Sequence, residues 1–327
     1  MTPPVVDTFG RVHSDLRISV TDRCNIRCFY CMPEEGAAFE SVSKLLSFAQ
    51  IARFVRVAAP LGFRKIRLTG GEPLLRPRLP DLITELNSIA GVDDLALTTN
   101  GVLLAQHARA LHAAGLRRLN IHLDTLDRAR FERITRRDEL SRVLAGIDAA
   151  QEAGFSIKLN AVAVKGLSEP DILPLVRFAR ERGFETRFIE FMPLDAQQIW
   201  SLDRVLTADQ ILRTLRDEFG PLDAVPDADP RAPATEYRFS NGDRVGFIAS
   251  VSKPFCMNCN RLRLTADGKL RYCLFALEET DIRQLIDGEP AALENAIRVN
   301  IRQKWAGHEI NQPIFVPPPR PMYSIGG

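Results

Sequence analysis

Three cysteines stand close together near the start of the chain, in the stretch Cys24-Asn-Ile-Arg-Cys28-Phe-Tyr-Cys31. Their spacing is C-x3-C-x2-C, and no fourth cysteine follows nearby. Three thiolates at this spacing can bind three irons of a cubane iron–sulfur cluster and leave the fourth iron without a protein ligand. An open coordination position is where a metal site binds a substrate. The sequence therefore predicts a 4Fe–4S cluster on Cys24, Cys28 and Cys31.

The other three cysteines form a second group, Cys256-Met-Asn-Cys259 followed by Cys273, with the spacing C-x2-C-x13-C. Two separated groups of three fit disulfide pairing poorly, because one cysteine of each group would have to pair outside it. Zinc usually takes four ligands, and no histidine adjoins the first group. We therefore expect a second 4Fe–4S cluster on Cys256, Cys259 and Cys273, again with one open iron.

The composition limits the class of protein. The 327 residues, 45% of them hydrophobic, suffice for one large domain with a smaller appendage. The formal net charge is +2, from 43 basic and 41 acidic residues, which argues against a protein that coats nucleic acid. No apolar run has the length of a membrane span, and thiolate-bound clusters need reducing surroundings. We expect a cytoplasmic protein with neither nucleic acid nor a membrane as partner.

Strand-like and helix-like segments alternate about every 30 residues, the pattern of repeated βαβ units with a parallel sheet. Strands are predicted at 16–20, 65–69, 95–99, 119–123, 157–164 and 187–191. Helices are predicted between them at 47–59, 80–90, 105–114, 127–153 and 171–182. Six units are too few for a complete eight-fold barrel, so we expect an α/β fold in which residues 1–193 form an incomplete (β/α)6 TIM-type barrel. A doubly wound sheet is the alternative, but the glycine fingerprint that usually follows its first strand is missing.

The rest of the chain, residues 194–327, is expected to form a smaller C-terminal region that carries the second cluster. A capping-box pattern opens a predicted helix over 207–219, and short strands are predicted at 237–239 and 245–248. A last helix is predicted over 291–305, ahead of a proline-rich end that closes on two glycines.

Ligands of parallel barrels gather at the carboxyl ends of the strands. The first cysteine group follows the first predicted strand, Gly70-Gly71-Glu72-Pro73 follows the second, and Thr98-Thr99-Asn100 ends the third. The paired glycines would let the backbone approach a ligand closely, and Glu72 could accept a hydrogen bond from an amino group. We expect these three segments to meet at one end of the barrel.

The first cysteine group, with the aromatic Tyr30 before its last cysteine, resembles the signature of the radical S-adenosylmethionine (SAM) superfamily. With the second group and the Arg261-Leu262-Arg263 run behind it, the chain resembles the GTP 3′,8-cyclases, which begin molybdenum cofactor biosynthesis. The resemblance extends from about Arg17 to the last residue. It implies two 4Fe–4S clusters and SAM as cofactors, and GTP as substrate. A 5′-deoxyadenosyl radical would remove the ribose 3′ hydrogen of GTP, and C3′ would then bond to C8 of guanine.

The resemblance assigns SAM contacts to the backbone of Tyr30, to Gly71 and to Met192, and Glu72 is expected to bind the amino group of SAM. Where the family usually has a serine, this chain has His122. We expect His122 to contact SAM through its ring or backbone, with a packed strand histidine as the alternative.

Five basic residues could converge on one pocket, which would suit a polyanion because arginine forks match phosphate oxygens. Two of them lie two residues apart on an extended segment, so their side chains point to the same side. The resemblance implies that all five bind GTP, together with one threonine and one leucine. These residues are Arg17, Arg67, Lys158, Arg261 and Arg263, with Thr98 and Leu262. The open iron of the second cluster would take the guanine base.

The resemblance also implies that Gly326 and Gly327 reach into the active site as a catalytic tail. Expected partners are GTP, an electron donor, a downstream cyclic pyranopterin monophosphate synthase that receives the product, and a second copy of the chain in a homodimer. Two alternatives stay open: another two-cluster radical SAM enzyme, such as a peptide-modifying maturase, and a zinc-binding interaction module attached to a barrel.

Overall fold

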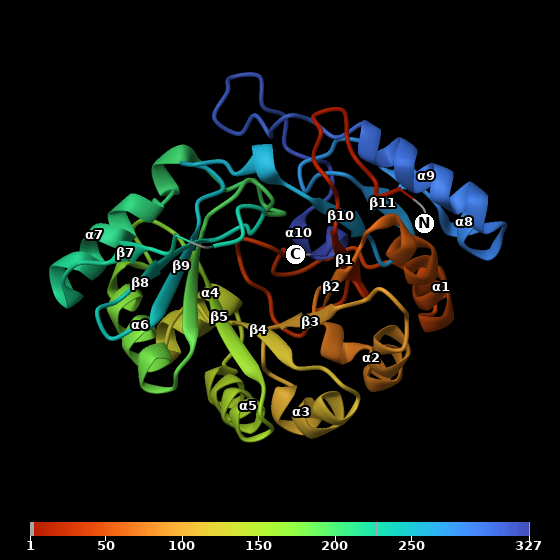
Figure 1. Ribbon diagram of the computed structural model, residues 1–327. Helices are drawn as coiled ribbons and strands as arrows, with labels where there is room; N and C mark the ends of the chain where they lie inside the picture. Colours follow the sequence, from red (N-terminus) through yellow and green to blue (C-terminus); the bar gives the residue numbers. More distant parts are fainter. Residues whose placement is uncertain (1–2, 227, 327) are drawn as a thin grey trace.

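A twelve-stranded sheet runs through the computed structural model, which describes residues 3–226 and 228–326. The strand order is β12-β11-β10-β1-β2-β3-β4-β5-β6-β9-β8-β7. Six parallel strands in chain order form its middle: β1 (Asp15–Ser19), β2 (Lys65–Thr69), β3 (Asp94–Thr99), β4 (Arg118–His122), β5 (Ser156–Ala163) and β6 (Glu185–Glu190). The helices that follow them are α1 (Phe48–Ala58), α2 (Leu79–Asn87), α3 (Leu104–Ala113), α4 (Arg128–Thr135), α5 (Leu140–Glu152) and α6 (Ile172–Glu181). Figure 1 shows the strands curving on the inside and the helices on the outside. The predicted alternation and the parallel α/β sheet are confirmed.

Local sequence signals set several of these elements. Helix α1 begins at the predicted capping box, in which the Ser47 hydroxyl accepts from the Gln50 amide at 3.1 Å and the Gln50 side chain accepts from the Ser47 amide at 3.0 Å. In β1, Leu16 and Ile18 are fully buried in the core, whereas Arg17 between them points to the other side of the sheet. That alternation places polar residues on the inner side of the curved sheet.

The helical pattern predicted over most of 127–153 is present as two helices, and the break between them after Thr135 was not predicted. Arg136 takes a left-handed conformation with φ of 56°. At the break, the carbonyl of Thr135 accepts from the amide of Arg27 at 2.8 Å, and the carbonyl of Ile134 accepts from that of Phe29 at 3.1 Å. The last turn of α4 therefore uses its free carbonyls to hold the first cysteine loop.

The C-terminal region extends the sheet at both edges. Strand β10 (Arg261–Leu264) pairs in parallel with β1, and β9 (Arg244–Ile248) pairs in parallel with β6. The outer strands are antiparallel: β7 (Asp223–Ala224), β8 (Thr235–Arg238), β11 (Lys269–Arg271) and β12 (Thr280–Asp281). The helices of this region are α7 (Ala208–Phe219), α8 (Arg283–Asp287), α9 (Pro290–Arg302) and α10 (Met322–Ile325). The strands predicted near 237 and 245 are present, and the extended segment predicted at Arg261 to Arg263 is β10. Strands β7, β11 and β12 were not predicted, and the division after residue 193 stays a prediction.

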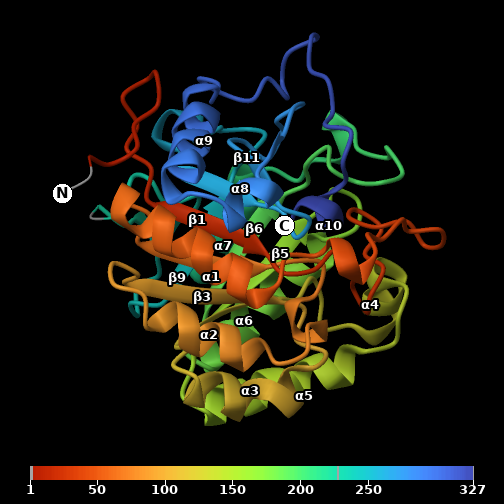
Figure 2. The same cartoon turned by 90° about the vertical axis from the view of Figure 1, so that its right-hand side faces the viewer.

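The end of the described chain packs against a second, small apolar cluster. It consists of Leu194, Val205, Val251, Phe275, Ile310 and Ile325, which are all buried. Through Ile325 it holds α10, which lies inside the curve of the strands in Figure 1 and at the carboxyl end of β1 in Figure 2. The last described residues are therefore part of the interior.

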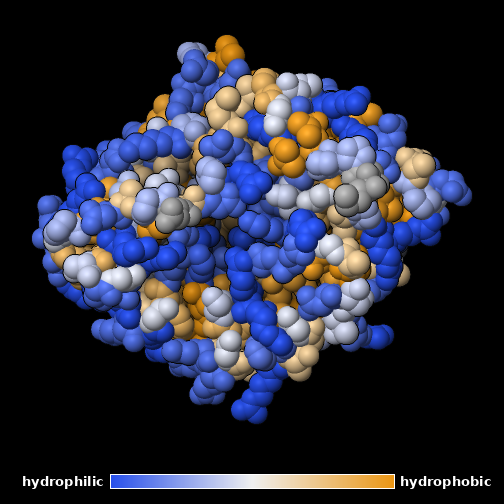
Figure 3. Space-filling model, viewed as in Figure 1, coloured by the Kyte–Doolittle hydropathy of each residue, from blue (hydrophilic) through white to orange (hydrophobic). Residues whose placement is uncertain are grey.

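The surface seen in Figure 3 is mostly hydrophilic, and its apolar residues lie in separated groups among polar ones. Met257, beside the second cysteine group, and Phe9, in an N-terminal hairpin, are among the exposed large apolar side chains. Within the described part of the chain, no helix combines the length and the apolar character that a bilayer crossing requires.

The N-terminal hairpin, bridged between Val6 and Val12, is tied to the second cysteine loop. The Asp7 carboxylate lies 2.5 Å from Arg11 Nε and 3.1 Å from His13 Nε2. The Arg11 guanidinium donates to the carbonyl of Cys256 at 2.7 Å and to those of the two residues 305 and 306. These bonds replace water around a buried arginine, so the hairpin supports the backbone next to Cys256.

Burial and the charge of Lys304 lower the pKa of His13 to about 4, although Asp7 acts in the opposite direction. Because the pKa is lower in the folded state than its ordinary value of 6.5, the unfolded chain takes the proton first as the pH falls. The stability that neutral His13 contributes is complete above pH 6.5 and is lost between that pH and about 4. We expect the wild-type free energy of unfolding to fall by about 2 kcal/mol more than that of His13→Gln between about pH 7.5 and about pH 5.

Urea titrations at the two pH values measure this difference. His107→Gln, on α3 and outside the hairpin, is the matched control and should keep the wild-type pH dependence. Equal pH dependence in the wild type and His13→Gln would contradict the prediction.

Candidate active site

Two neighbouring cavities lie on the inner side of the parallel strands, one beside each cysteine group. The first is at the carboxyl ends of the strands, and the second lies farther along their inner face. The first, of about 210 Å³, is lined by Cys24, Cys28 and Cys31, and the second, of about 170 Å³, by Cys256, Cys259 and Cys273. Five residues line both cavities: Thr98, Asn160, Ile189, Met192 and Met322. The two cysteine groups therefore face adjoining cavities across a common wall.

The donor set of the first cavity fits a soft metal cluster. All three thiols are free, and Cys28 is buried. Burial and the nearby Glu72 charge raise the pKa of Cys24 to about 12, and burial raises that of Cys31. Thiols in such surroundings stay protonated until a metal takes the place of the proton. Within the described residues no group of three or more His, Cys, Asp or Glu side chains is arranged to hold a metal ion, but a cubane binds each thiolate to a different iron.

Backbone contacts with the loop after β2 hold the first cysteine loop. The amide of Gly71 donates to the carbonyl of Thr21 at 2.7 Å, and the amide of Glu72 donates to that of Arg23 at 2.7 Å. A Cβ at Gly70 would lie 2.6 Å from the Thr21 oxygen, and one at Gly71 would collide with the Arg23 oxygen. The two glycines are thus needed so that one backbone can approach another. Both also line the first cavity.

The carboxylate of Glu72 was expected in the first cavity but does not line it. It accepts hydrogen bonds from other residues of the chain instead. Glu72 is fully buried and accepts from the Thr99 hydroxyl at 2.8 Å, the Asn100 amide at 2.7 Å and the Leu74 amide at 3.0 Å. Burial raises its pKa to about 7, against the effect of these hydrogen bonds. The structure corrects the expected SAM contact: Glu72 links the loops after β2 and β3.

A hydrogen-bonded group of three side chains forms part of the first cavity. The Tyr30 hydroxyl donates to Asp124 Oδ2 at 2.5 Å and also lies 2.5 Å from His122 Nε2, which is 2.9 Å from the same carboxylate. Burial alone would lower the pKa of His122, but Asp124 raises it to about 10. His122 therefore lines the cavity as expected and is not simply core filling. Asp124 was missed, although its position two residues after His122 is a signal that both face one side.

Three arginines lie side by side across three strands of the second cavity. The strand register sets Arg17 opposite Arg263 on one side and opposite Arg67 on the other. Among the described residues, none of the three has a carboxylate within ion-pair distance, and Nε of Arg17 and of Arg67 is buried without a hydrogen-bond partner. Burial and the two neighbouring charges lower the pKa of Arg17, and burial lowers that of Arg263 to about 10. Buried, adjacent, unpaired cations form a site for an anion with several charges.

Comparison with known proteins agrees with this chemistry. Residues 18–179 match the radical SAM superfamily, and residues 184–310 match the molybdenum cofactor synthesis C family. The chain is 49% identical to a GTP 3′,8-cyclase of Rhodopirellula baltica, over its whole length and 94% of that relative. It is 48% identical to a GTP 3′,8-cyclase 2 of Mycobacterium tuberculosis, over its whole length and 93% of that relative. This chain belongs to the GTP 3′,8-cyclase family.

Solved structures with lower identity share the fold. The chain superposes on SuiB of Streptococcus suis bound to SAM with a TM-score of 0.64 and 14% identity, over 90% of this chain and 69% of SuiB. It superposes on anSMEcpe with bound SAM with a TM-score of 0.58 and 14% identity, over 91% of this chain and 79% of the other. These likenesses confirm the radical SAM fold. That superfamily uses SAM and a 4Fe–4S cluster, for which Cys24, Cys28 and Cys31 are the available thiols.

Lys158 and Leu262, which the family resemblance implied as GTP contacts, have side chains outside the second cavity. Lys158 does not line the second cavity, and its ammonium group is 2.5 Å from Glu185 and 3.5 Å from Glu236. The side chain of Leu262 is fully buried in the main core, on the side of β10 away from the cavity. Lys158 therefore has its charge compensated by its own chain, and Leu262 can meet a ligand only through its backbone.

Two other cations line the second cavity and were not predicted. Arg187, in β6, lies between Glu185 and Glu236, at 2.5 and 2.9 Å. Lys304, after α9, donates to the carbonyls of Arg261 and Tyr272. Arg187 lies two residues before Ile189 on β6, so both face the cavity, and this spacing is the signal that could have found it, whereas no local signal marks Lys304.

The donor set of the second cavity contains one thiol that favours its ionised form. Nε and Nη2 of Arg261 lie 3.3 and 3.2 Å from Cys259 Sγ. Burial acts to raise the pKa of Cys259, but the charges of Arg261 and Lys304 lower it to about 6. As a thiolate is the form that binds metal, this group also fits a cluster.

The C-terminal residues form part of both cavities. Met322 lines the two of them, and Tyr323 lines the first. The carbonyl of Gly326 accepts from Arg263 at 2.7 Å, and a Cβ at Gly326 would lie 2.7 Å from that of Ser19. Gly326 thus lies at the arginine site, as expected, whereas Gly327 lies outside the described residues. The roles of Met322 and Tyr323 were not predicted.

The close approach of Gly71 to Arg23 predicts the effect of adding one methyl group. Gly71→Ala would push the loop after β2 away from the first cysteine loop, because the new Cβ meets a backbone oxygen that cannot rotate away. We expect the iron content after anaerobic reconstitution to fall by about four atoms per chain. Iron and sulfide analysis measures it.

Gly288→Ala is the matched control, since a Cβ at Gly288 makes only ordinary contacts, the nearest at 3.6 Å. Full iron content in Gly71→Ala would show that the close approach does not hold the first site together.

Proposed function

We propose that the chain catalyses GTP 3′,8-cyclisation, the first step of molybdenum cofactor biosynthesis. SAM is cleaved reductively, and the resulting 5′-deoxyadenosyl radical abstracts the ribose 3′ hydrogen of GTP. The C3′ radical bonds to C8 of guanine, and one electron and one proton complete (8S)-3′,8-cyclo-7,8-dihydroguanosine 5′-triphosphate. The observation that carries the proposal is the row of unpaired arginines beside a three-cysteine group, in a cavity that shares a wall with the radical SAM site.

Two 4Fe–4S clusters are proposed, the second on Cys256, Cys259 and Cys273. When bound, they supply a low-potential electron for SAM cleavage at the first site and an open iron for the guanine base at the second. SAM is proposed to lie in the first cavity against Tyr30, Gly71, His122 and Met192. Glu72 is left out of this set, because its carboxylate is fully buried and does not line the first cavity.

The arginines have the task of holding the triphosphate. Arg17 and Arg67 each have a buried Nε without an acceptor, and Arg261 and Arg263 add two more positive charges to the same cavity. Phosphate oxygens are proposed to be the acceptors. Thr98 stands in the shared wall, where a bound nucleotide would pass from the arginine row toward the first cavity. Fixing the ribose next to SAM turns hydrogen abstraction into a reaction between neighbours in a site without bulk water.

The proposed architecture is an incomplete (β/α)6 barrel, with β9 and β10 added to its two edge strands and α10 at its open side. An electron donor is proposed as a partner, and the product would pass to a cyclic pyranopterin monophosphate synthase. A homodimer in the cytoplasm is proposed for the assembled enzyme.

The test is an anaerobic incubation of reconstituted protein with SAM, dithionite and either GTP or ATP. We expect 5′-deoxyadenosine and a cyclised guanosine triphosphate with GTP, and no cyclised product with ATP. Mass spectrometry of the nucleotides measures both. The absence of a cyclised product from iron-replete protein would refute the proposal.

The same assay tests the arginine row. Arg67→Leu should raise KM for GTP roughly 30-fold, because charge-assisted hydrogen bonds to a phosphate are lost. Arg64→Leu removes an exposed arginine that pairs with Asp93 and should keep the wild-type KM.

Gly326 and Gly327 are proposed to act in turnover. Deleting both should lower cyclisation roughly 100-fold, because the contact of the Gly326 carbonyl with Arg263 at the arginine site is lost. The iron content should stay unchanged, since no cysteine is touched. Wild-type turnover in the deletion variant would rule out a catalytic role for the tail.

A further inference from the structure

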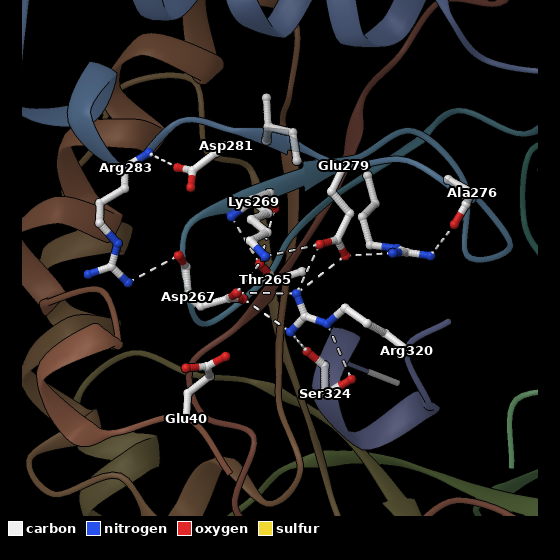
Figure 4. A network of polar contacts seen from close by, with 12 residues as sticks. Glu40, Thr265, Asp267, Lys269, Ala276, Glu279, Asp281, Arg283, Arg320 and Ser324 are labelled. Carbon is white, nitrogen blue, oxygen red and sulfur yellow. Dashed lines mark hydrogen bonds and ion pairs between the residues drawn. The ribbon is translucent and has the colours of Figure 1, made fainter. Parts of the chain in front are cut away.

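A polar network holds the end of the chain from outside the two cavities, with Arg320 at its centre (Figure 4). The Arg320 guanidinium contacts both oxygens of Asp267 at 3.2 Å, and both oxygens of Glu279 at 3.1 and 3.3 Å. It also donates to the carbonyl of Ser324, in α10, at 2.6 Å. One side chain thus links two carboxylates of the sheet to the helix that precedes Gly326.

One of the two carboxylates, Glu279, is tied to the second cysteine loop through Arg271. Asp267 lies in the turn between β10 and β11, and Glu279 directly precedes β12. Arg271, which is fully buried, contacts Glu279 at 2.5 Å and donates to the carbonyls of Leu274 and Ala276, next to Cys273. The position of Arg320 is therefore set by the loop that carries a proposed cluster ligand.

Helix α10, which Arg320 contacts, depends on tertiary contacts for its stability. Helix α10 has four residues, and helices of this length are unstable without tertiary contacts. Its other anchors are the amide of Met322, which donates to the carbonyl of Leu194 at 3.0 Å, and Ile325 in the small apolar cluster. Arg320 provides its ionic anchor, between Asp267, which is 7% exposed, and Glu279, which is 13% exposed.

We propose that Arg320 is a positioning residue that latches α10 to the β10–β12 edge of the sheet. The latch keeps Met322 in the wall between the cavities and keeps the Gly326 carbonyl on Arg263. The importance of this latch for catalysis rests on the proposed role of the tail in turnover. The latch itself is a statement about the position of the tail. Loss of the latch frees the tail while both cysteine groups stay in place.

The experiment compares Arg320→Ala with Lys269→Ala in reconstituted full-length protein. Lys269 forms ion pairs with the same two carboxylates, at 3.4 and 3.5 Å, and neither of these pairs involves a residue of the tail. Lys269→Ala is therefore a matched control for the loss of one positive charge. Amide hydrogen exchange is measured on peptides that cover residues 318–327 and 261–281, without substrates. The tail peptide of Arg320→Ala should exchange about tenfold faster than in wild type, and that of Lys269→Ala should stay within about twofold. The iron content and the exchange of the strand peptide should stay unchanged in both.

Asp267→Asn provides a second variant that removes a partner of Arg320 and keeps its shape, and it should also speed exchange in the tail. Wild-type protection of the tail in both Arg320→Ala and Asp267→Asn would overturn the proposal. Equal loosening in Lys269→Ala, or iron loss in Arg320→Ala, would also overturn it, because Arg320 would then support the whole region. Turnover of the same variants, set beside the diglycine deletion, separates the two ideas: a freed tail with wild-type turnover refutes the role of the tail and leaves the latch standing.

Discussion

Repulsion among buried arginines is the constraint on which the rest of the site depends. Arg17 has Arg263 on one neighbouring strand and Arg67 on the other, so three positive charges stand in one row of a parallel sheet. Like charges directly opposite each other destabilise a sheet, and burial adds to the cost. The chain tolerates this row because hydrophobic packing on the other face, through residues such as Leu16 and Leu262, holds the strands together. An anion bound to the row would offset this repulsion, so the proposed triphosphate substrate would also stabilise the site.

The C-terminal region completes the site by adding strands to both edges of the central sheet. Strand β10 pairs with β1 and brings Arg261, Arg263 and the second cysteine loop to the side of the first. The N-terminal hairpin then supports the backbone of Cys256 through Arg11. Each cavity is therefore built from segments far apart in sequence, and Met322 joins them from the end of the chain.

The two cysteine groups and the βα alternation could be predicted from the sequence because these features are local, whereas the arginine site was predicted from the family resemblance. Cysteine spacing lies within one loop, and apolar alternation identifies a strand without knowledge of its partner. Lys158 was misplaced because two carboxylates distant in sequence, Glu185 and Glu236, determine where its charge is used. The break after Thr135 was missed because its reason is the cysteine loop that bonds to the helix end. Strands β7, β11 and β12 were missed because strands of two or three residues have no reliable pattern.

The pairing of β1 with β10 has a consequence for synthesis. Strand β1 leaves the ribosome early, but its second neighbour follows more than two hundred residues later. Until then one side of β1 presents unsatisfied amide and carbonyl groups to any strand in the cell, while the six central strands can already form. During synthesis the chain therefore exposes an unpaired strand edge that is prone to aggregation. We expect a chaperone that binds the nascent chain to bind at this edge.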